Sequence, residues 1–211
     1  AAYNEGLAYA KDRKQFGKAI IDFPAVYDML AIMKGKLDAG RALLYQTARY
    51  VDIYKALDDI SRERKLTPEE RLEQKKYAKL ADSFTPLAKG MNSEYANQNA
   101  YDCIQIHGGS GFMMEYACQR IYRDARITSI YEGTTQLQTV AAIRYVTNGS
   151  YLATIREFET VPCSPEMEPL MSRLKKMADL FEASTNAVKE AQDQELLDFT
   201  ARRLMEMAAD I

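Results

Sequence analysis

The chain of 211 residues contains no apolar run that approaches the roughly 20 residues needed for a helix to cross a bilayer. Its first residues, AAYNEGLAYAKDRKQFG, also lack the pattern of a signal peptide. We therefore expect a soluble, cytoplasmic protein with no membrane partner. The length suits one sizeable domain with or without a helical extension, rather than two independent domains.

An excess of positive charge is missing as well. The 28 Lys and Arg residues are balanced by 30 Asp and Glu residues, giving a formal net charge of -2, and the two signs are interspersed. Such a chain has no basic face of the kind that binds nucleic-acid backbones. We expect no nucleic-acid partner.

Cysteine and histidine are scarce. The three cysteines, Cys103, Cys118 and Cys163, are odd in number and fit no metal-ligand or redox spacing. We interpret them as buried or inert thiols and expect no metal site. The sole histidine, His107, is interpreted as a packed neighbour of a glycine turn rather than as a catalyst.

Alternating apolar and polar runs are nearly absent, so the sequence predicts an all-α fold. We expect one helix from the start of the chain toward Gly17 and a second from Pro24 to near Leu57. A third should begin at a capping box at Thr67 and run to Gly108, with an interruption and kink at Pro86. A fourth should run from Thr135 to about Gly149. A charged, solvated excursion covers residues 58 to 76. Pro162, Pro165 and Pro169 then indicate a linker, followed by an amphipathic helix from Leu170 that continues toward the terminus. These features divide the chain into a bundle, residues 1–149, and a helical extension, residues 150–211.

One isolated carboxylate, Glu132, follows Ile130 and Tyr131 and precedes GTT, which reads as the start of a helix. Apolar neighbours would disfavour its charged form and make it a better base, whereas a helix N-terminus would favour the charged form. The sequence leaves that balance open. Nearby, Arg120, Arg123, Asp124 and Arg126 alternate in sign and predict a salt-bridged helix surface.

Four strings, RKQFG (13–17), QIHGGSGF (105–112), YRDARI (122–127) and IYEGTTQLQ (130–138), resemble the C-terminal domain of the acyl-CoA dehydrogenases in type, order and spacing. The resemblance covers residues 1 to about 149 and fits the extended branch of that family. It implies a four-helix bundle whose first helix is truncated here, so that apolar stripes are exposed and the chain associates with itself or another chain. The middle domain that holds the flavin ring would be absent, and we expect the 211 residues alone to be inactive and to lose FAD.

The resemblance also implies an activity, namely oxidation of acyl-CoA to trans-2-enoyl-CoA in fatty acid beta-oxidation, with FAD as cofactor. Glu132 matches the family's base, which removes the α-proton. The implied cofactor-binding residues are Arg13, Gln15, Phe16, Gln105, Gly108, Gly109, Thr134 and Gln136. Tyr131 and Gly133 would line the thioester end of the substrate pocket. Electron-transfer flavoprotein is the implied electron acceptor, and a homodimer or homotetramer is implied because several of these residues contact the FAD of a neighbouring subunit.

Other interpretations stay open. Arg13 would otherwise be a solvated cation at a helix end, the glycines a helix C-cap, and Thr134 and Gln136 ordinary capping residues. The bundle could also be an inactive oligomerisation scaffold, or it could belong to an acyl-CoA oxidase-type flavoprotein. Glutamate rather than aspartate at position 132 disfavours a nitroalkane-oxidising relative.

Overall fold

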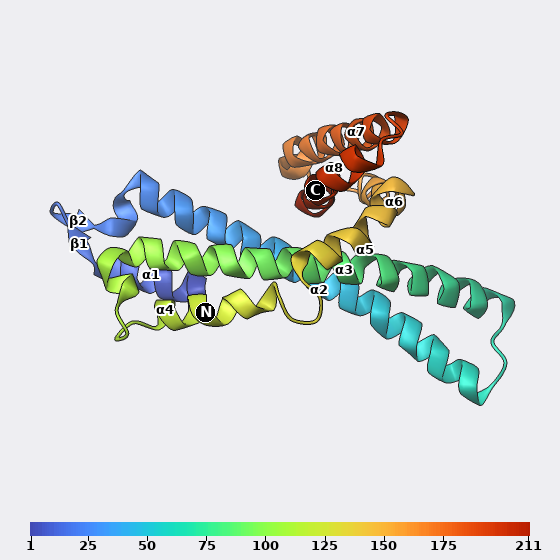
Figure 1. The fold of residues 1–211 in the computed structure, drawn as a ribbon, viewed down its shortest axis with the longest axis horizontal. Helices are drawn as coiled ribbons and strands as arrows, with labels where there is room; N and C mark the ends of the chain where they lie inside the picture. The colour runs from blue at the N-terminus through green and yellow to red at the C-terminus, as the bar shows by residue number, and fades with distance from the viewer. The chain divides into compact units, whose positions relative to one another are not determined.

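The computed structural model describes residues 1–211 and consists almost entirely of helices (Figure 1). The all-α prediction is therefore confirmed. The α-helices are α1 (Ala2–Asp12), α2 (Pro24–Glu63), α3 (Pro68–His107), α4 (Ala117–Thr128), α5 (Thr135–Thr147), α6 (Ser150–Phe158), α7 (Glu168–Glu190) and α8 (Gln194–Asp210). Three 3-10 helices, η1 (Ile20–Asp22), η2 (Gly108–Phe112) and η3 (Pro165–Met167), and one hairpin, β1 (Lys14–Gln15) with β2 (Lys18–Ala19), complete the fold. None of the helices combines the length and hydropathy of a membrane span.

The predicted starts of three helices are confirmed. The helices α2 and α3 begin at Pro24 and Pro68, where a missing backbone donor costs nothing. The capping box is formed, because Glu70 N donates to Thr67 Oγ1 at 3.2 Å and Thr67 N donates to Glu70 Oε2 at 2.9 Å. Likewise α5 begins at Thr135.

The first helix was expected to reach Gly17, and this is wrong. It ends at Asp12, and the chain then forms the hairpin, in which Lys14 pairs with Ala19 and Gln15 with Lys18. Between the strands, Phe16 and Gly17 have φ of +52° and +85°. Positive φ at both central residues is the geometry of a two-residue hairpin turn, and glycine at position 17 adopts it without steric cost.

The helix α2 extends further than predicted, and α3 is not interrupted as predicted. α2 continues past Leu57 to Glu63, so only residues 64–67 separate it from α3, and most of the charged excursion is helix. The i,i+4 pair Arg62–Asp58, at 2.8 Å, lies on this extension. Nor does Pro86 interrupt α3, because its neighbours Phe84 and Leu87 are buried and their packing offsets the lost backbone hydrogen bond.

The tail differs from its prediction in two ways. Residues 150–158, for which no separate helix was predicted, form α6 before the proline-rich linker. The helix expected to continue to the terminus ends at Glu190, after which Gln192 has φ of +51° and Asp193 caps α8. The Asp193 carboxylate accepts hydrogen bonds from the backbone of Glu195 and Leu196 at 2.9 and 3.1 Å, and this local cap explains the break.

The chain forms two compact units that are not consecutive in sequence. Unit 1 comprises residues 1–44 and 90–135, and unit 2 comprises residues 45–89 and 136–211. Within unit 1, α1 packs against α4 (Figure 1). The apolar core of unit 1 includes Leu30 and Met33 of α2, Cys103 and Ile106 of α3, and Cys118 of α4.

Unit 2 is built around buried aromatic rings. Phe84 of α3 packs edge-on against Tyr50 of α2 and Tyr151 of α6, with ring centroids 5.3 and 5.5 Å apart. The helices α7 and α8 lie side by side (orange and red in Figure 1), with Phe181 and Met205 fully buried. Unit 2 therefore has its own core.

Candidate active site

Glu132 lies in unit 1, exposed on the turn between α4 and α5. Its φ is +52° and that of Gly133 is +94°, so two successive residues have left-handed backbone conformations. A residue other than glycine adopts this conformation at a cost of roughly 1–3 kcal/mol, and such residues cluster at functional sites. Backbone strain thus falls on the carboxylate that the sequence singles out.

Hydrogen bonds hold this turn at both ends. Tyr131 N donates to Ile127 O at 3.0 Å, and Thr135 N donates to Ser129 O at 3.1 Å. The Thr135 hydroxyl also donates to a carboxylate oxygen of Glu94 at 2.5 Å, which joins the start of α5 to α3. Sequence reasoning missed Glu94, because it lies 41 residues before Thr135 and belongs to no motif.

The other residues predicted near Glu132 occupy the same turn and the first turn of α5. Tyr131 is half exposed, Gly133 and Thr134 are half-buried, and Gln136 is exposed. Their proximity follows from the sequence itself. What the structure reveals beyond the sequence is the strained backbone at Glu132 and the hydrogen bonds that hold the turn.

A second set of predicted residues is brought together only by the fold. They line a pocket of about 670 Å³ in unit 1: Arg13, Gln15, Phe16, Gln105, Gly108 and Gly109. The first three come from the hairpin that follows α1, and the others come from the end of α3 and the start of η2. Thr134 and Gln136, predicted to contact the same cofactor, are not part of this lining.

The hairpin presents Phe16 at its tip, where the residue is 94% exposed. Its ring packs edge-on against Phe23 at 6.3 Å between centroids, and Lys18 Nζ lies 4.3 Å from the centroid of the Phe23 ring. Because exposure of a large aromatic ring is unfavourable, this tip is suited to contact another molecule.

Two glycines beside the pocket differ sharply from a third. A Cβ added at Gly108 or Gly109 would meet no atom of the chain within 4 Å, and Gly108 has φ of +59°. A Cβ at Gly111 would lie 2.6 Å from Ile104 O and 2.9 Å from His107 Cβ. Internal packing therefore requires glycine at position 111, whereas the space next to Gly108 and Gly109 is free for a ligand.

The pocket chemistry fits part of a nucleotide-like cofactor. Arg13 supplies a guanidinium with forked donors suited to phosphate, Gln15 and Gln105 supply amides, and the glycines allow close backbone approach. The volume lies in the range of small-molecule sites. The residues present thus suit a phosphate-bearing ligand.

His107 is buried, as predicted, and Tyr9 is a neighbour that sequence reasoning missed. The His107 and Tyr9 rings stack with centroids 4.1 Å apart, and the Tyr9 hydroxyl donates to Ser110 Oγ at 3.3 Å. His107 Nδ1 donates to the Cys103 carbonyl oxygen at 2.7 Å. These contacts brace the end of α3 that carries the pocket residues.

The prediction of a salt-bridged surface on α4 is wrong. Arg120, Arg123, Asp124 and Arg126 form no ion pair, and Arg126 instead donates to Ser129 Oγ at 2.6 Å. The charges alternate in sequence, but exposed pairs gain little and side-chain entropy opposes them. Arg126 thereby supports the turn that carries Glu132.

Comparison with protein families agrees with this architecture. Residues 1–146 match the model described as acyl-CoA dehydrogenase, C-terminal domain, which is well over half of the chain. The chain belongs to the acyl-CoA dehydrogenase family. Residues 147–211 match a second model, described as acyl-CoA dehydrogenase C terminal, so the tail is also a family feature.

Individual relatives cover part of the chain. Caffeyl-CoA reductase-Etf complex subunit CarC of Acetobacterium woodii is 39% identical over 137 residues, which is 65% of this chain and 30% of that protein. The (2S)-methylsuccinyl-CoA dehydrogenase of Cereibacter sphaeroides is 34% identical over 143 residues, or 68% of this chain and 22% of that protein. The chain thus spans less than a third of these acyl-CoA dehydrogenase relatives.

A solved structure covers the tail as well. The FAD complex of an acyl-CoA dehydrogenase from Bacillus anthracis aligns with 98% of this chain and 36% of its own, with a TM-score of 0.68 and 24% identity. At this identity the likeness concerns the fold. It includes α6 to α8 in the shared architecture.

Proposed function

We propose that this chain is the C-terminal helical domain of an FAD-dependent acyl-CoA dehydrogenase that oxidises an acyl-CoA to the trans-2-enoyl-CoA. The observation that carries the proposal is Glu132, an exposed carboxylate on a strained turn that hydrogen bonds hold at both ends. Membership of the family supports the same role.

In this reaction the Glu132 carboxylate removes a proton from the α-carbon of the acyl-CoA. The electron pair of that C–H bond forms the new double bond, and the β-hydrogen leaves with its own pair. Bound FAD would supply the acceptor for that hydride. Tyr131 and Gly133, on either side of Glu132, would line the thioester end of the substrate, and a fixed turn keeps the base in place.

The pocket in unit 1 would hold part of the FAD of a neighbouring copy in a homodimer or homotetramer. Arg13 would pair with the pyrophosphate, Gln15, Phe16 and Gln105 would lie beside it, and Gly108 and Gly109 would let it approach the backbone. Thr134 and Gln136 would lie near the adenosine half of the cofactor at the start of α5.

Electron-transfer flavoprotein is the proposed electron acceptor. The name of the Acetobacterium woodii relative associates that protein with an Etf complex. Transfer to a second flavoprotein would regenerate the oxidised cofactor after each turnover.

A second candidate is the reverse reaction, reduction of an enoyl-CoA. The relatives at 39% and 36% identity are both named as reductases. The same carboxylate would then be protonated and deliver its proton to the α-carbon, as microscopic reversibility requires. Direction would depend on the redox partner rather than on Glu132.

The decisive experiment is anaerobic bleaching of the flavin in the full-length gene product by a panel of acyl-CoAs, comparing wild type with Glu132→Gln. A general base contributes about 10²- to 10⁴-fold, so the variant should bleach at least about a hundredfold more slowly while retaining FAD. Glu73→Gln, which changes an exposed carboxylate of α3 in unit 2, is the matched control and should bleach normally.

If neither wild type nor variant bleached with any acyl-CoA although both kept FAD, the oxidation would be refuted. Re-oxidation of chemically reduced flavin by enoyl-CoAs would then support the reductase. Absence of both reactions would favour a helical scaffold without activity. For the 211 residues alone we propose no catalysis and no FAD retention, which stoichiometric flavin on the purified chain would refute.

A further inference from the structure

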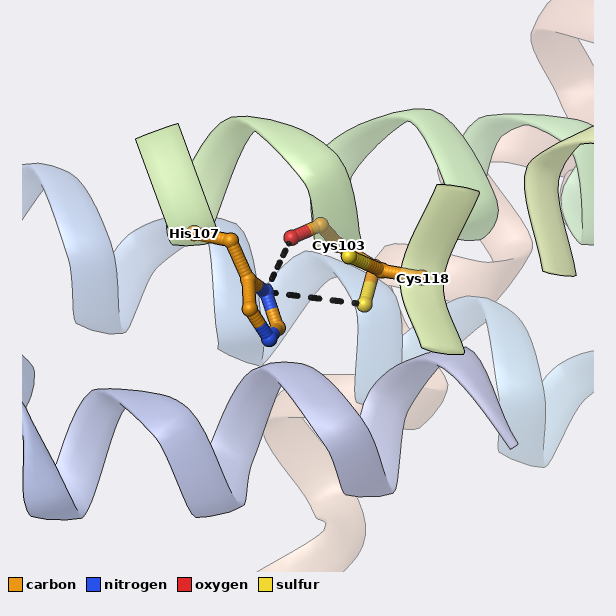
Figure 2. A group of neighbouring side chains, drawn as sticks. All are labelled: Cys103, His107 and Cys118. Atoms are coloured by element: carbon orange, nitrogen blue, oxygen red, sulfur yellow. Dashed lines mark hydrogen bonds between the residues drawn. The ribbon is translucent and has the colours of Figure 1, made fainter. Parts of the chain in front are cut away.

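Two cysteines and the only histidine converge in the core of unit 1. Cys103 and His107 lie one helical turn apart on α3, and Cys118 approaches them from α4 (Figure 2). One donor atom from each lies within 4.8 Å of the other two, and all three side chains are buried. Sequence spacing did not indicate this cluster, because Cys118 lies on a different helix.

The spacing is close to that of a metal site. In a tetrahedral zinc site, Zn–S bonds of about 2.3 Å and Zn–N bonds of about 2.0 Å put neighbouring donors roughly 3.5–3.8 Å apart. Cys103 Sγ lies 4.0 Å from His107 Nδ1. Closing the cluster around an ion would therefore require movements on the order of 1 Å, which rotamer adjustment can supply.

His107 can turn toward the sulfurs without leaving a buried carbonyl unsatisfied. Its Nδ1 now donates to the Cys103 carbonyl oxygen at 2.7 Å. Within α3 the same carbonyl is the i−4 acceptor of the backbone N–H of His107. Loss of the side-chain bond would leave that helical bond in place, and Nε2 would carry the ring proton.

Charge also favours a divalent cation. Two thiolates and a neutral imidazole would balance a charge of +2, so the filled site would be neutral in an apolar core. Burial raises the pKa of both Cys103 and Cys118, so both thiols carry a proton before binding and the ion has to displace it.

We propose that Cys103, His107 and Cys118 form a structural binding site for a thiophilic divalent cation, of which Zn²⁺ is the probe of choice. Binding exchanges two thiol protons for two metal–sulfur bonds, with no change in oxidation state. It would tie α3 to α4 next to η2, the segment that carries Gly108 and Gly109. The ion would stabilise the fold and take no part in chemistry.

The test is titration of the reduced protein with Cd²⁺ under anaerobic conditions, following the ultraviolet charge-transfer band of cadmium thiolates, with Co²⁺ as the probe of tetrahedral geometry. One ion per chain should bind to wild type. Cys103→Ala and Cys118→Ala should each weaken binding at least about tenfold, since each removes a ligand. Cys163→Ala is the matched control, because Cys163 is an exposed thiol outside the cluster.

A band that survives Cys103→Ala but disappears in Cys163→Ala would overturn the proposal, as would no band at all. Because the alanine variants could fail to fold, wild type is also heated with Zn²⁺ and with Mg²⁺. Zn²⁺ alone should raise the Tm, since an ion bound only by the native state stabilises it. No rise at saturating Zn²⁺, or an intact mass showing a Cys103–Cys118 disulfide in the protein as isolated, would refute the site.

Discussion

Unit 1 departs from regular helix where the candidate active site lies, whereas unit 2 consists of helices held by buried rings and ion pairs. Two of the three residues other than glycine with positive φ, Phe16 and Glu132, belong to unit 1, and the third, Gln192, only separates α7 from α8. In unit 2, Arg156 of α6 binds Asp179 and Glu182 of α7, each at 2.7 Å. Irregular backbone therefore marks candidate function in one unit and a simple helix end in the other.

The largest expected effect is a loss of folding stability in unit 2, at a residue outside the candidate active site. Tyr151 is 1% exposed, packs against Phe84, and donates from its hydroxyl to Ser83 O at 2.6 Å. Tyr151→Ala should cost about 3–5 kcal/mol in the free energy of unfolding, because it leaves a cavity in the core. Urea denaturation checks this value.

Tyr151→Phe is the control for that experiment. It keeps the ring and removes only the hydroxyl, so it should cost about 0.5–1.5 kcal/mol, the net value of one hydrogen bond, because the Ser83 carbonyl keeps its bond within α3. Equal losses for both variants would mean that packing of the ring contributes little. Unit 2 would then lack the rigid core that the comparison assigns to it.

A pair of glycines in unit 1 gives the next prediction. Gly111→Ala should destabilise the protein by about 1–3 kcal/mol, since its Cβ would lie 2.6 Å from Ile104 O. Gly109→Ala should leave the free energy of unfolding within about 0.5 kcal/mol, because no atom of the chain is within reach. In the full-length gene product, however, Gly109→Ala should weaken FAD binding, which flavin absorbance after dialysis measures.

The opposite pattern would break the comparison. If Gly109→Ala were destabilising but kept its FAD, the glycine would serve packing and the pocket would lose its proposed ligand. If Gly111→Ala were neutral, η2 could move away from α3 at little cost.

Local signals in the sequence predicted the helix starts well. Pro24, the Thr67 capping box and Thr135 each act through their own neighbours, and the structure has helices starting at all three. The hairpin was missed because its strands are only two residues long, too short to show alternation. The end of α7 was missed because neither glycine nor proline lies between Glu190 and Gln194, and only the cap at Asp193 reveals the break.

In the candidate site, too, residues that are adjacent in sequence could be predicted together, whereas contacts between distant segments could not. Glu132 and its neighbours are adjacent in sequence, so a motif could name them together. The pocket joins residues near 13–16 to residues near 105–109, which the resemblance named but only the fold brings together. The pairing of Cys103 with Cys118 depends on how α1, α3 and α4 pack, and no sequence spacing encodes it.

A smaller effect is expected at the loop between α2 and α3. Thr67→Ala removes the acceptor for Glu70 N and should cost about 1 kcal/mol in the free energy of unfolding, the usual value of an N-cap. Thr67→Ser keeps the hydroxyl and should be nearly neutral. Urea midpoints for the two variants give the comparison, and equal midpoints would show that the cap contributes nothing to α3.

The smallest effect concerns pH. A hydrogen bond from Arg64, followed by one from Thr67 N, lowers the pKa of Glu70 from 4.5 to about 2. Because the folded-state pKa is lower than the unfolded one, the stabilisation is present above pH about 4.5 and is lost as pH falls toward 2. Carboxyl NMR titration should give a midpoint near 2 for Glu70 in the wild type.

Arg64→Met sharpens that prediction, since it removes the first cause and leaves the capping bond. The Glu70 midpoint should rise toward its ordinary value but stay below it, because Thr67 N still donates to the carboxylate at 2.9 Å. An unchanged midpoint would mean that the exposed Arg64–Glu70 pair, 2.6 Å apart in the structure, is not populated in solution. Such a result would align this pair with the unpaired arginines of α4, where alternating charge in the sequence also produces no ion pair.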